Sequence, residues 1–228
     1  MSKPIYDYRS FKLSKLGTPE YHHLLYLLGW VGYFSLYFLT ENLIPVEKCY
    51  PMHCFVDDLI PFHEAFVIPY TSWYLLIVIS LLFFMLYDVD SFKKLQTYII
   101  ITQVVAMFFY IILPTRQDLR PEVFPRENFL TSVVAFLYSF DTPTGVCPSL
   151  HVAYSLGIAS VWLKSKDASL LWKIIVVIWI VIICLSTAFV KQHSFVDILA
   201  ALPLGVLAEI LTFHVFKFKE TPLKKFQP

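Results

Sequence analysis

Two residues late in the chain, His193 and Asp197, have the types and the spacing of a catalytic pair. Side chains four residues apart share one face of a helix, so the carboxylate can reach the imidazole. A carboxylate bonded to one ring nitrogen fixes the tautomer and leaves the other nitrogen free as a nucleophile. The spacing is equally compatible with a simple hydrogen bond at the start of a helix, so the pair alone does not establish catalysis.

Other residues suited to phosphate chemistry stand near the ends of other apolar segments. His151 supplies a second imidazole. Arg120, Lys191 and Arg116 are cations, and Arg offers a planar fork of donors to phosphate oxygens whereas Lys offers a point charge. Ser149 opens an apolar segment, where the free backbone N–H groups of a helix N-terminus favour an anion. These residues predict a site for a phosphate group.

The elements that must position these side chains are long apolar segments. Of the 228 residues, 57% are hydrophobic and only 15% charged, whereas a soluble domain carries about a quarter charged residues. A hydrocarbon core about 30 Å thick requires roughly 17–25 apolar residues per helix. Five segments are long enough, 21–39, 67–87, 95–113, 171–190 and 195–216, and the shorter segment 149–163 is apolar enough for a helix packed inside a bundle.

These segments predict an all-α integral membrane protein in which residues 1–228 form one domain, a bundle of six transmembrane helices. No linker long enough to separate two domains interrupts the chain. The apolar segment 129–140 is too short to cross and lies between charged segments. We therefore expect it to form a short interfacial or re-entrant helix before the fourth span.

The distribution of Lys and Arg predicts the orientation of this bundle. With six spans, both termini lie on the same side of the membrane as the loops that precede the third and fifth spans. That side holds thirteen of the 18 basic residues, namely Lys3, Arg9, Lys12, Lys15, Lys93, Lys94, Lys164, Lys166, Lys173, Lys217, Lys219, Lys224 and Lys225. The other side holds Lys48, Arg116, Arg120, Arg126 and Lys191. Basic residues of short loops stay in the cytoplasm, so we expect both termini there.

The same layout brings the candidate residues together on the opposite face, which is periplasmic, extracellular or lumenal. Four helix ends that are distant in the sequence reach one membrane depth on that side. This convergence favours catalysis over an isolated polar residue at the headgroup level.

A metal site is the competing chemistry for two histidines and an aspartate. No third close ligand accompanies them and the nearby cations would repel a metal, so we expect neither a metal nor a cofactor. A second polar cluster lies on the same face and comprises His53, Asp57, Asp58, His63 and Glu64. Zinc or calcium is conceivable there, but a solvated loop over the site is favoured.

The remaining polar and sulfur-containing residues leave alternatives open. A Cys49–Cys54 bridge is plausible in an oxidising compartment, and Cys147 is an alternative partner. Cys184 lies inside a span and is expected to pack there. Glu209, inside the last span, either marks an ion path or is paired within the cytoplasmic half of the bundle.

The segments around these residues resemble the type 2 phosphatidic acid phosphatase superfamily. Its signature comprises a Lys…Arg-Pro segment, a Pro-Ser-Gly-His segment and a Ser-Arg…His…Asp segment with five residues before the His and three after. The corresponding segments here read Arg120-Pro121, Pro148-Ser149-Leu150-His151 and Ser186-Thr187…His193…Asp197. The resemblance extends over residues 113–205.

Three positions depart from that signature. The family Lys falls at Leu113, Leu150 stands for Gly, and Thr187 stands for Arg. Arg116 and Lys191 are candidate replacements for the missing cations. The segments that contain Leu150 and Thr187 resemble those of the branch that includes inositol phosphorylceramide synthases and short bacterial relatives.

The resemblance implies a mechanism. His193 would attack phosphorus and form a phosphohistidine, Asp197 would hold its other nitrogen, and His151 would protonate the leaving oxygen. The phosphate-binding residues would be Arg120, Lys191, Arg116, Ser149 and Ser186.

The resemblance leaves three functions to be separated. With water as acceptor, the enzyme hydrolyses a lipid phosphate monoester or diphosphate, which is the favoured function. With a lipid or sugar hydroxyl, it is a phosphotransferase similar to inositol phosphorylceramide synthase. A non-catalytic lipid transporter or scaffold that retains the fold is the third. The expected partners are a lipid phosphate substrate and membrane lipids, without nucleic acid, and the oligomeric state stays open.

Overall fold

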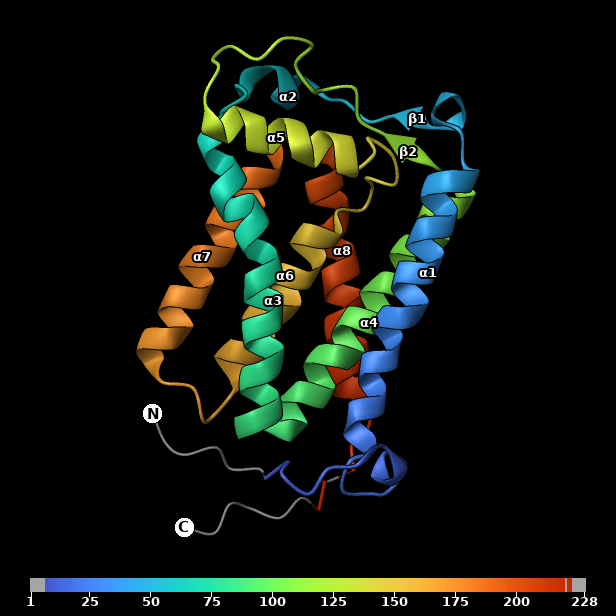
Figure 1. The fold of residues 1–228 in the computed structure, drawn as a ribbon, viewed down its shortest axis with the longest axis vertical. Helices are drawn as coiled ribbons and strands as arrows, with labels where there is room; N and C mark the ends of the chain where they lie inside the picture. The colour runs from blue at the N-terminus through green and yellow to red at the C-terminus, as the bar shows by residue number, and fades with distance from the viewer. Residues whose placement is uncertain (1–6, 220, 223–228) are drawn as a thin grey trace.

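The computed structural model describes residues 7–219 and 221–222, and regular structure in this part of the chain is almost entirely helical. Six helices run along the long dimension of the molecule (Figure 1). They are α1 (Leu28–Leu43), α3 (Val67–Tyr87), α4 (Val89–Ile112), α6 (Leu150–Lys164), α7 (Leu170–Phe189) and α8 (Phe195–Ile210). The all-α class predicted from the sequence is confirmed.

Within the described residues, five helical segments are long and apolar enough to cross a membrane. They are His22–Leu43, Glu64–Tyr87, Val89–Ile112, Leu170–Phe189 and Phe195–Val215. Helix α6 has 15 residues, about 22 Å at 1.5 Å per residue, which is less than the roughly 30 Å of a hydrocarbon core. It packs against α4, α7 and α8 inside the bundle. A sixth crossing by α6 therefore stays a prediction.

The predicted bounds of three spans are corrected by the structure. The first was expected over 21–39, but a 3-10 segment, His22–Leu27, precedes α1, which continues to Leu43. The third was expected to begin at residue 95, but α4 begins at Val89. The carboxylate of Asp88 accepts a hydrogen bond from the Ser91 N–H and caps the helix there, as short acidic residues commonly do. The last span was expected over 195–216, but α8 ends at Ile210 and a π-helical segment, Leu211–Val215, completes it. The remaining span ends agree within one residue.

This earlier start of α4 changes the position of two basic residues. Lys93 and Lys94 lie in the first turns of the helix, not in a loop. The Lys93 ammonium is buried and lies 2.6 Å from a carboxylate oxygen of Asp90. Three other basic residues used to predict the orientation, Lys3, Lys224 and Lys225, lie outside the described residues.

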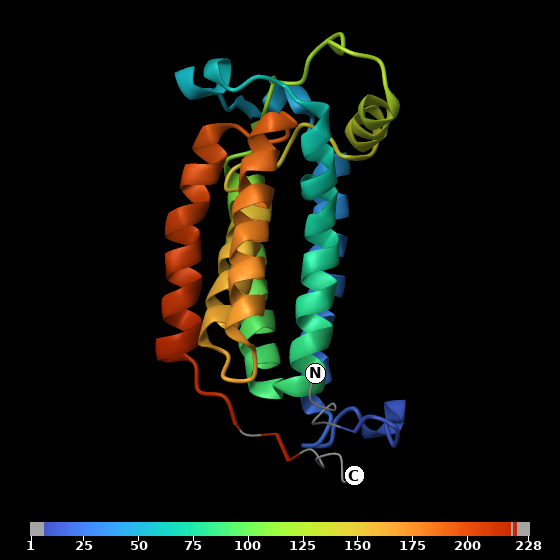
Figure 2. The same ribbon diagram turned by 90° about the vertical axis from the view of Figure 1, so that its left-hand side faces the viewer.

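The loops that face the candidate site cover one end of the bundle (Figures 1 and 2). They contain α2 (Phe55–Leu59), α5 (Phe129–Phe140) and a parallel pair of short strands, β1 (Tyr50–Pro51) and β2 (Thr115–Arg116), with Tyr50 opposite Thr115. Helix α5 lies across this end of the bundle (Figure 1). The described segments nearest the two termini, Leu13–Lys15 and Leu211–Val215, lie at the opposite end (Figure 2).

The bounds of α5 agree with the predicted short helix before α6. The side chain of Asn128 accepts hydrogen bonds from the N–H groups of Leu130 and Thr131 and starts the helix. One face buries Val134, whereas Phe129 is 79% exposed on the other side. Such an amphipathic helix fits the surface of a membrane.

Three helices meet closely around one tyrosine. A Cβ atom added to Gly157 of α6 would lie 2.3 Å from the ring of Tyr98 in α4, so only glycine fits there. The Tyr98 hydroxyl donates to the carbonyl of Gly205 in α8 over 3.0 Å. This contact sets the relative positions of α6 and α8, whose N-terminal ends carry the candidate histidine and aspartate.

The structure also shows which of the two predicted environments Glu209 occupies. Its carboxylate accepts a hydrogen bond from the Ser160 hydroxyl at 2.6 Å and forms an ion pair with Lys164. Glu209 is therefore paired between α6 and α8, as one of the two alternatives predicted.

Candidate active site

His193 lies in the short connection between α7 and α8 and is 7% exposed. Its Nδ1 is 3.1 Å from the carbonyl oxygen of Val146 and 3.4 Å from Oδ2 of Asp197. Both neighbours can only accept a hydrogen bond, so Nδ1 carries the proton and Nε2 keeps its lone pair. Among the described residues, no hydrogen bond occupies Nε2. The imidazole is therefore held in the tautomer that a nucleophile requires.

Asp197 is held by the start of α8. The segment Ser-Phe-Val-Asp forms a capping box, in which Asp197 Oδ2 accepts from the Ser194 N–H at 2.8 Å. The carboxylate is fully buried, and its Oδ1 has no hydrogen-bond partner among the described residues. The positive end of the helix dipole favours a negative charge at this position. The same carboxylate thus caps α8 and faces the ring of His193.

His151 lies in the first turn of α6, directly beside His193. The centroids of the two rings are 5.6 Å apart. The imidazole of His151 packs against the rings of Tyr70 and Trp73 from α3, with centroid distances of 4.5 and 4.1 Å. Its buried Nε2 has no hydrogen-bond partner among the residues that the structure describes. The structure thus brings both predicted histidines and Asp197 together.

The starts of α6 and α8 are joined through Ser149. Its N–H donates to the carbonyl oxygen of Asp197 at 3.1 Å, and its hydroxyl caps α6 by accepting from the Val152 N–H. Ser149 is fully buried. Ser186 is also fully buried, and its hydroxyl donates to the Ile183 carbonyl of its own helix at 2.6 Å. In this structure both predicted phosphate-binding serines use their hydroxyl groups within a helix.

Arg120 reaches the residue next to His193. Its Nε and Nη2 atoms donate to Oε1 of Gln192 at 3.1 and 2.6 Å. Further donors bond to the carbonyl oxygens of Tyr138 and Asp141 at 3.2 and 2.9 Å, and the guanidinium lies 4.4 Å from the centre of the Tyr138 ring. Burial lowers the pKa of Arg120. Four of the five guanidinium N–H groups are thus bonded within the protein.

The other two predicted cations point to the loop between α1 and α3, residues 44–66, which we call the first outer loop. The Lys191 ammonium donates to the carbonyl oxygens of Asp57 and Ile60 at 2.8 and 2.5 Å, and burial lowers its pKa. Arg116 donates to the Asp118 carboxylate at 3.0 Å and to the Cys49 carbonyl at 3.0 Å. The structure therefore places only Arg120, of the three, against the segment that carries His193.

The second polar cluster does not form a single solvated loop. Asp57 is 3% exposed and Glu64 6%, so the expected solvated loop is wrong for these two residues. Glu64 is paired with Arg126 at 2.8 Å. His53 and Asp58 do form an exposed pair, at 2.8 Å. Within the described residues, no group of three or more His, Cys, Asp or Glu side chains is arranged to hold a metal ion.

Two residues that complete the surroundings of His193 were missed by the sequence analysis. Asp141 follows α5, and its carboxylate accepts from the Tyr37 hydroxyl at 2.6 Å and from Nε2 of Gln192 at 3.2 Å. Gln192 in turn binds Arg120. Gln192 could have been found from the sequence because it directly precedes His193. Asp141 could not, because no sequence pattern indicates its partners, which lie 104 and 51 residues away.

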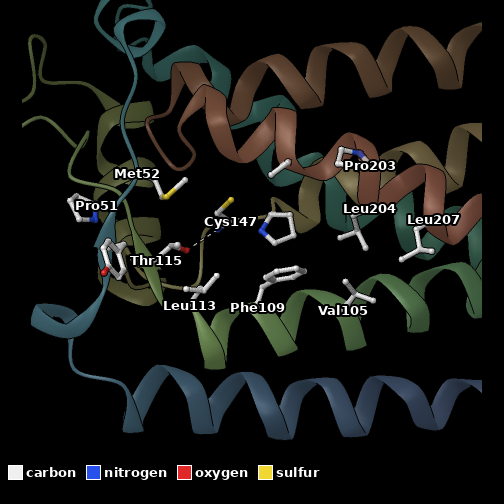
Figure 3. A pocket seen from close by; sticks show the side chains of 13 residues that line it. Pro51, Met52, Val105, Phe109, Leu113, Thr115, Cys147, Pro203, Leu204 and Leu207 are labelled. Atoms are coloured by element: carbon white, nitrogen blue, oxygen red, sulfur yellow. Dashed lines mark hydrogen bonds between the residues drawn. The ribbon is translucent and has the colours of Figure 1, made fainter.

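An apolar groove of about 730 Å³ lies between α4 and α8, and the segment that leads to His151 reaches it through Cys147 and Pro148. Its walls include Val105 and Leu204, and its polar end is formed by Thr115 and Cys147, joined by a hydrogen bond of 3.1 Å (Figure 3). Burial, and then the nearby Asp197 charge, raise the pKa of the Cys147 thiol to about 12. This thiol stays protonated at neutral pH and does not serve as a nucleophile.

None of the cysteines is paired in the structure. All four, Cys49, Cys54, Cys147 and Cys184, are free thiols. Neither of the two disulfide pairings considered from the sequence is therefore present.

Comparison with known proteins agrees with this geometry. A family model described as the PAP2 superfamily matches residues 95–220, which is more than half of the chain and includes Arg120, His151, His193 and Asp197. Neither the curated proteins nor the solved structures contain a significant match. The chain belongs to the type 2 phosphatidic acid phosphatase (PAP2) superfamily.

Proposed function

We propose that this protein hydrolyses a lipid phosphate monoester or diphosphate through a phosphohistidine on His193. Members of the PAP2 superfamily are in general membrane phosphatases or related phosphotransferases. The observation that carries the proposal is the environment of His193, whose Nδ1 faces Val146 O and Asp197 while Nε2 has no protein partner among the described residues.

In the first step, Nε2 of His193 attacks phosphorus and forms the N–P bond, and the bond from phosphorus to the lipid oxygen breaks. His151, whose ring is adjacent, gives its proton to the departing oxygen. The positive charge that develops on the His193 ring is stabilised by the Asp197 carboxylate and the Val146 carbonyl through Nδ1–H.

In the second step, His151 removes a proton from a water molecule that attacks the phosphohistidine. The N–P bond breaks, inorganic phosphate leaves and both imidazoles return to their starting forms. The positive charge of Arg120, and its one N–H without a partner among the described residues, support the negative oxygens of the transferring group. Lys191 and Arg116 would have to leave their carbonyl partners to contribute in the same way.

The test is phosphate release by the purified protein in detergent, with a chelator and without added metal. Phosphatidic acid, phosphatidylglycerol phosphate and undecaprenyl diphosphate are suitable substrates. His193→Ala is expected to lower kcat by at least about 10³-fold, because it removes the nucleophile. His53→Ala, which removes an exposed histidine at the same end of the bundle, is the matched control and should retain activity.

The alternative functions predict different outcomes. Release that persists in His193→Ala would contradict the proposed mechanism. No release by the wild-type protein, with or without an added hydroxyl lipid, would favour a transporter or scaffold that retains the fold. Release that requires an added hydroxyl lipid would favour a phosphotransferase, the alternative supported by Leu150 and Thr187 in the signature segments.

We also propose that both termini lie in the cytoplasm and that the site faces the periplasm, the exterior or an organelle lumen. The supporting observation is the excess of Lys and Arg in the segments at the end opposite α2 and α5.

A further inference from the structure

The short helix α2, in the first outer loop, contacts the segment that carries His193. Oδ2 of Asp57 accepts a hydrogen bond from the Ser194 hydroxyl at 2.6 Å, and Oδ1 accepts from the Phe195 N–H at 2.7 Å. These partners lie 137 and 138 residues away along the chain. One carboxylate therefore binds both residues that follow the nucleophile.

The residue two positions before His193 is bonded to the same short helix. Lys191 donates to the carbonyl oxygens of Asp57 and Ile60, where a helix end presents unpaired acceptors. Its backbone has a φ of 53°, the left-handed region that residues other than glycine rarely adopt. The lysine side chain therefore anchors a tight turn, and His193 is enclosed between two contacts with α2.

Asp57 is suited to this role because it is buried and ionised. Burial by itself would raise its pKa, but hydrogen bonds from Ser194, the Phe195 N–H and the Cys54 N–H outweigh burial and lower the pKa. The carboxylate is 3% exposed and also accepts from the Cys54 N–H at 2.8 Å, which fixes α2 itself. The next residue, Asp58, points to solvent and pairs only with His53 among the described residues.

We propose that Asp57 is a positioning residue that holds the backbone around His193 in the conformation required for attack on phosphorus. The inference rests on the proposed function. Asp57 acts through Ser194, the first residue of the capping box that also contains Asp197, and so aligns the carboxylate and the imidazole together. A displacement of a reacting group by about 1 Å lowers the rate about 10²-fold.

The experiment compares Asp57→Asn with Asp58→Asn in the full-length protein, using the phosphate-release assay. Asn has nearly the same shape but lacks the charge, and its amide nitrogen cannot accept from Ser194 or Phe195. We expect kcat of Asp57→Asn to fall about 10- to 100-fold while KM changes less than about threefold, since Asp57 does not touch substrate. Asp58→Asn should match the wild type in both constants.

Size-exclusion profiles and thermal unfolding of the two variants show whether each is folded. If Asp57→Asn does not fold, the fallback variant is Ser194→Ala, which removes the hydroxyl that donates to the carboxylate and that also accepts from the Val196 N–H at the start of α8. It should lower kcat about 2- to 10-fold, as loss of a hydrogen bond does.

A folded Asp57→Asn with wild-type kcat would overturn the inference, as would a change confined to KM. Unchanged kcat in Ser194→Ala would overturn it where Asp57→Asn is unfolded. A wild-type protein without activity on any phosphate ester would instead overturn the proposed function on which the inference rests.

Discussion

At the scale of single residues, two acceptors share Nδ1 of His193. The Val146 carbonyl is closer, at 3.1 Å, than the Asp197 carboxylate, at 3.4 Å. Either acceptor requires the proton on Nδ1, but only the carboxylate adds a negative charge beside the ring. In the proposed mechanism, the carbonyl therefore contributes to the tautomer, and Asp197 chiefly stabilises the cationic ring formed during attack.

This division predicts the effect of Asp197→Asn. The amide oxygen can still accept from the Ser194 N–H and cap α8, but the negative charge is lost. The NH₂ group is a donor, so where it faces Nδ1 it favours the tautomer in which Nδ1 carries no proton. We expect kcat to fall about 10⁴-fold with little change in KM, by analogy with the loss of a buried aspartate beside a catalytic histidine. Steady-state kinetics in detergent measures both constants. Activity within tenfold of the wild type would show that the Val146 carbonyl suffices.

At the scale of the elements, the site depends on how α4, α6 and α8 approach one another. His151 and Asp197 stand at the first turns of α6 and α8, and Ser149 joins these turns by its hydrogen bond to the Asp197 carbonyl. Deeper in the bundle, Tyr98 of α4 fills the space left by the missing side chain of Gly157. Packing far from the candidate site thus sets the spacing of its helices.

Gly157→Ala should therefore destabilise the protein. The added methyl group would lie 2.3 Å from the Tyr98 ring, and overpacking of a core typically costs about 1–3 kcal/mol. Thermal unfolding in detergent should show a lower Tm. Gly32→Ala in α1 is the matched control, because a Cβ atom there meets nothing within 4 Å. Equal Tm values for the two variants would mean that α4 and α6 separate without penalty.

At the scale of the whole molecule, the two ends of the bundle differ in charge and in structure. The end with α2, α5 and the strand pair carries the site, and the segments near both termini lie at the other end (Figure 2). Helices of this length and apolar composition fit an integral membrane protein. The bilayer would then separate the site from most of the Lys and Arg residues.

Cysteine labelling tests the proposed orientation. In a cysteine-free background, Asp118→Cys introduces a thiol at the end that carries the site, and Lys166→Cys introduces one in the connection between α6 and α7; both positions are exposed. We expect a membrane-impermeant maleimide to label position 118 from the non-cytoplasmic side, and position 166 only after permeabilisation. The reverse pattern would place the site in the cytoplasm.

Much of the bundle and the centre of the site could be predicted from the sequence because the signals are local. Apolar length marks a spanning helix, and residue types within one short segment mark His193 and Asp197 as a pair. The expected shared helix face is wrong, because α8 begins at Phe195 and the turn before it, not the helix, brings His193 within 3.4 Å of Asp197. The bounds of α3 and α5 followed directly from the apolar segments. The start of α4 did not, because the Asp88 cap extends the helix through Lys93 and Lys94, which composition alone assigns to a loop.

The sequence by itself determined that His193 and Asp197 lie close together, since residue types and a separation of four residues are properties of a short segment. Only the tertiary structure decided where the other charges point. Lys191 and Arg116 bind carbonyl groups of the first outer loop, whereas Arg120 reaches Gln192. Asp57 reaches Ser194 across 137 residues. Such contacts depend on how the helices pack and where the loops cross the end of the bundle, and no periodicity within one segment encodes them.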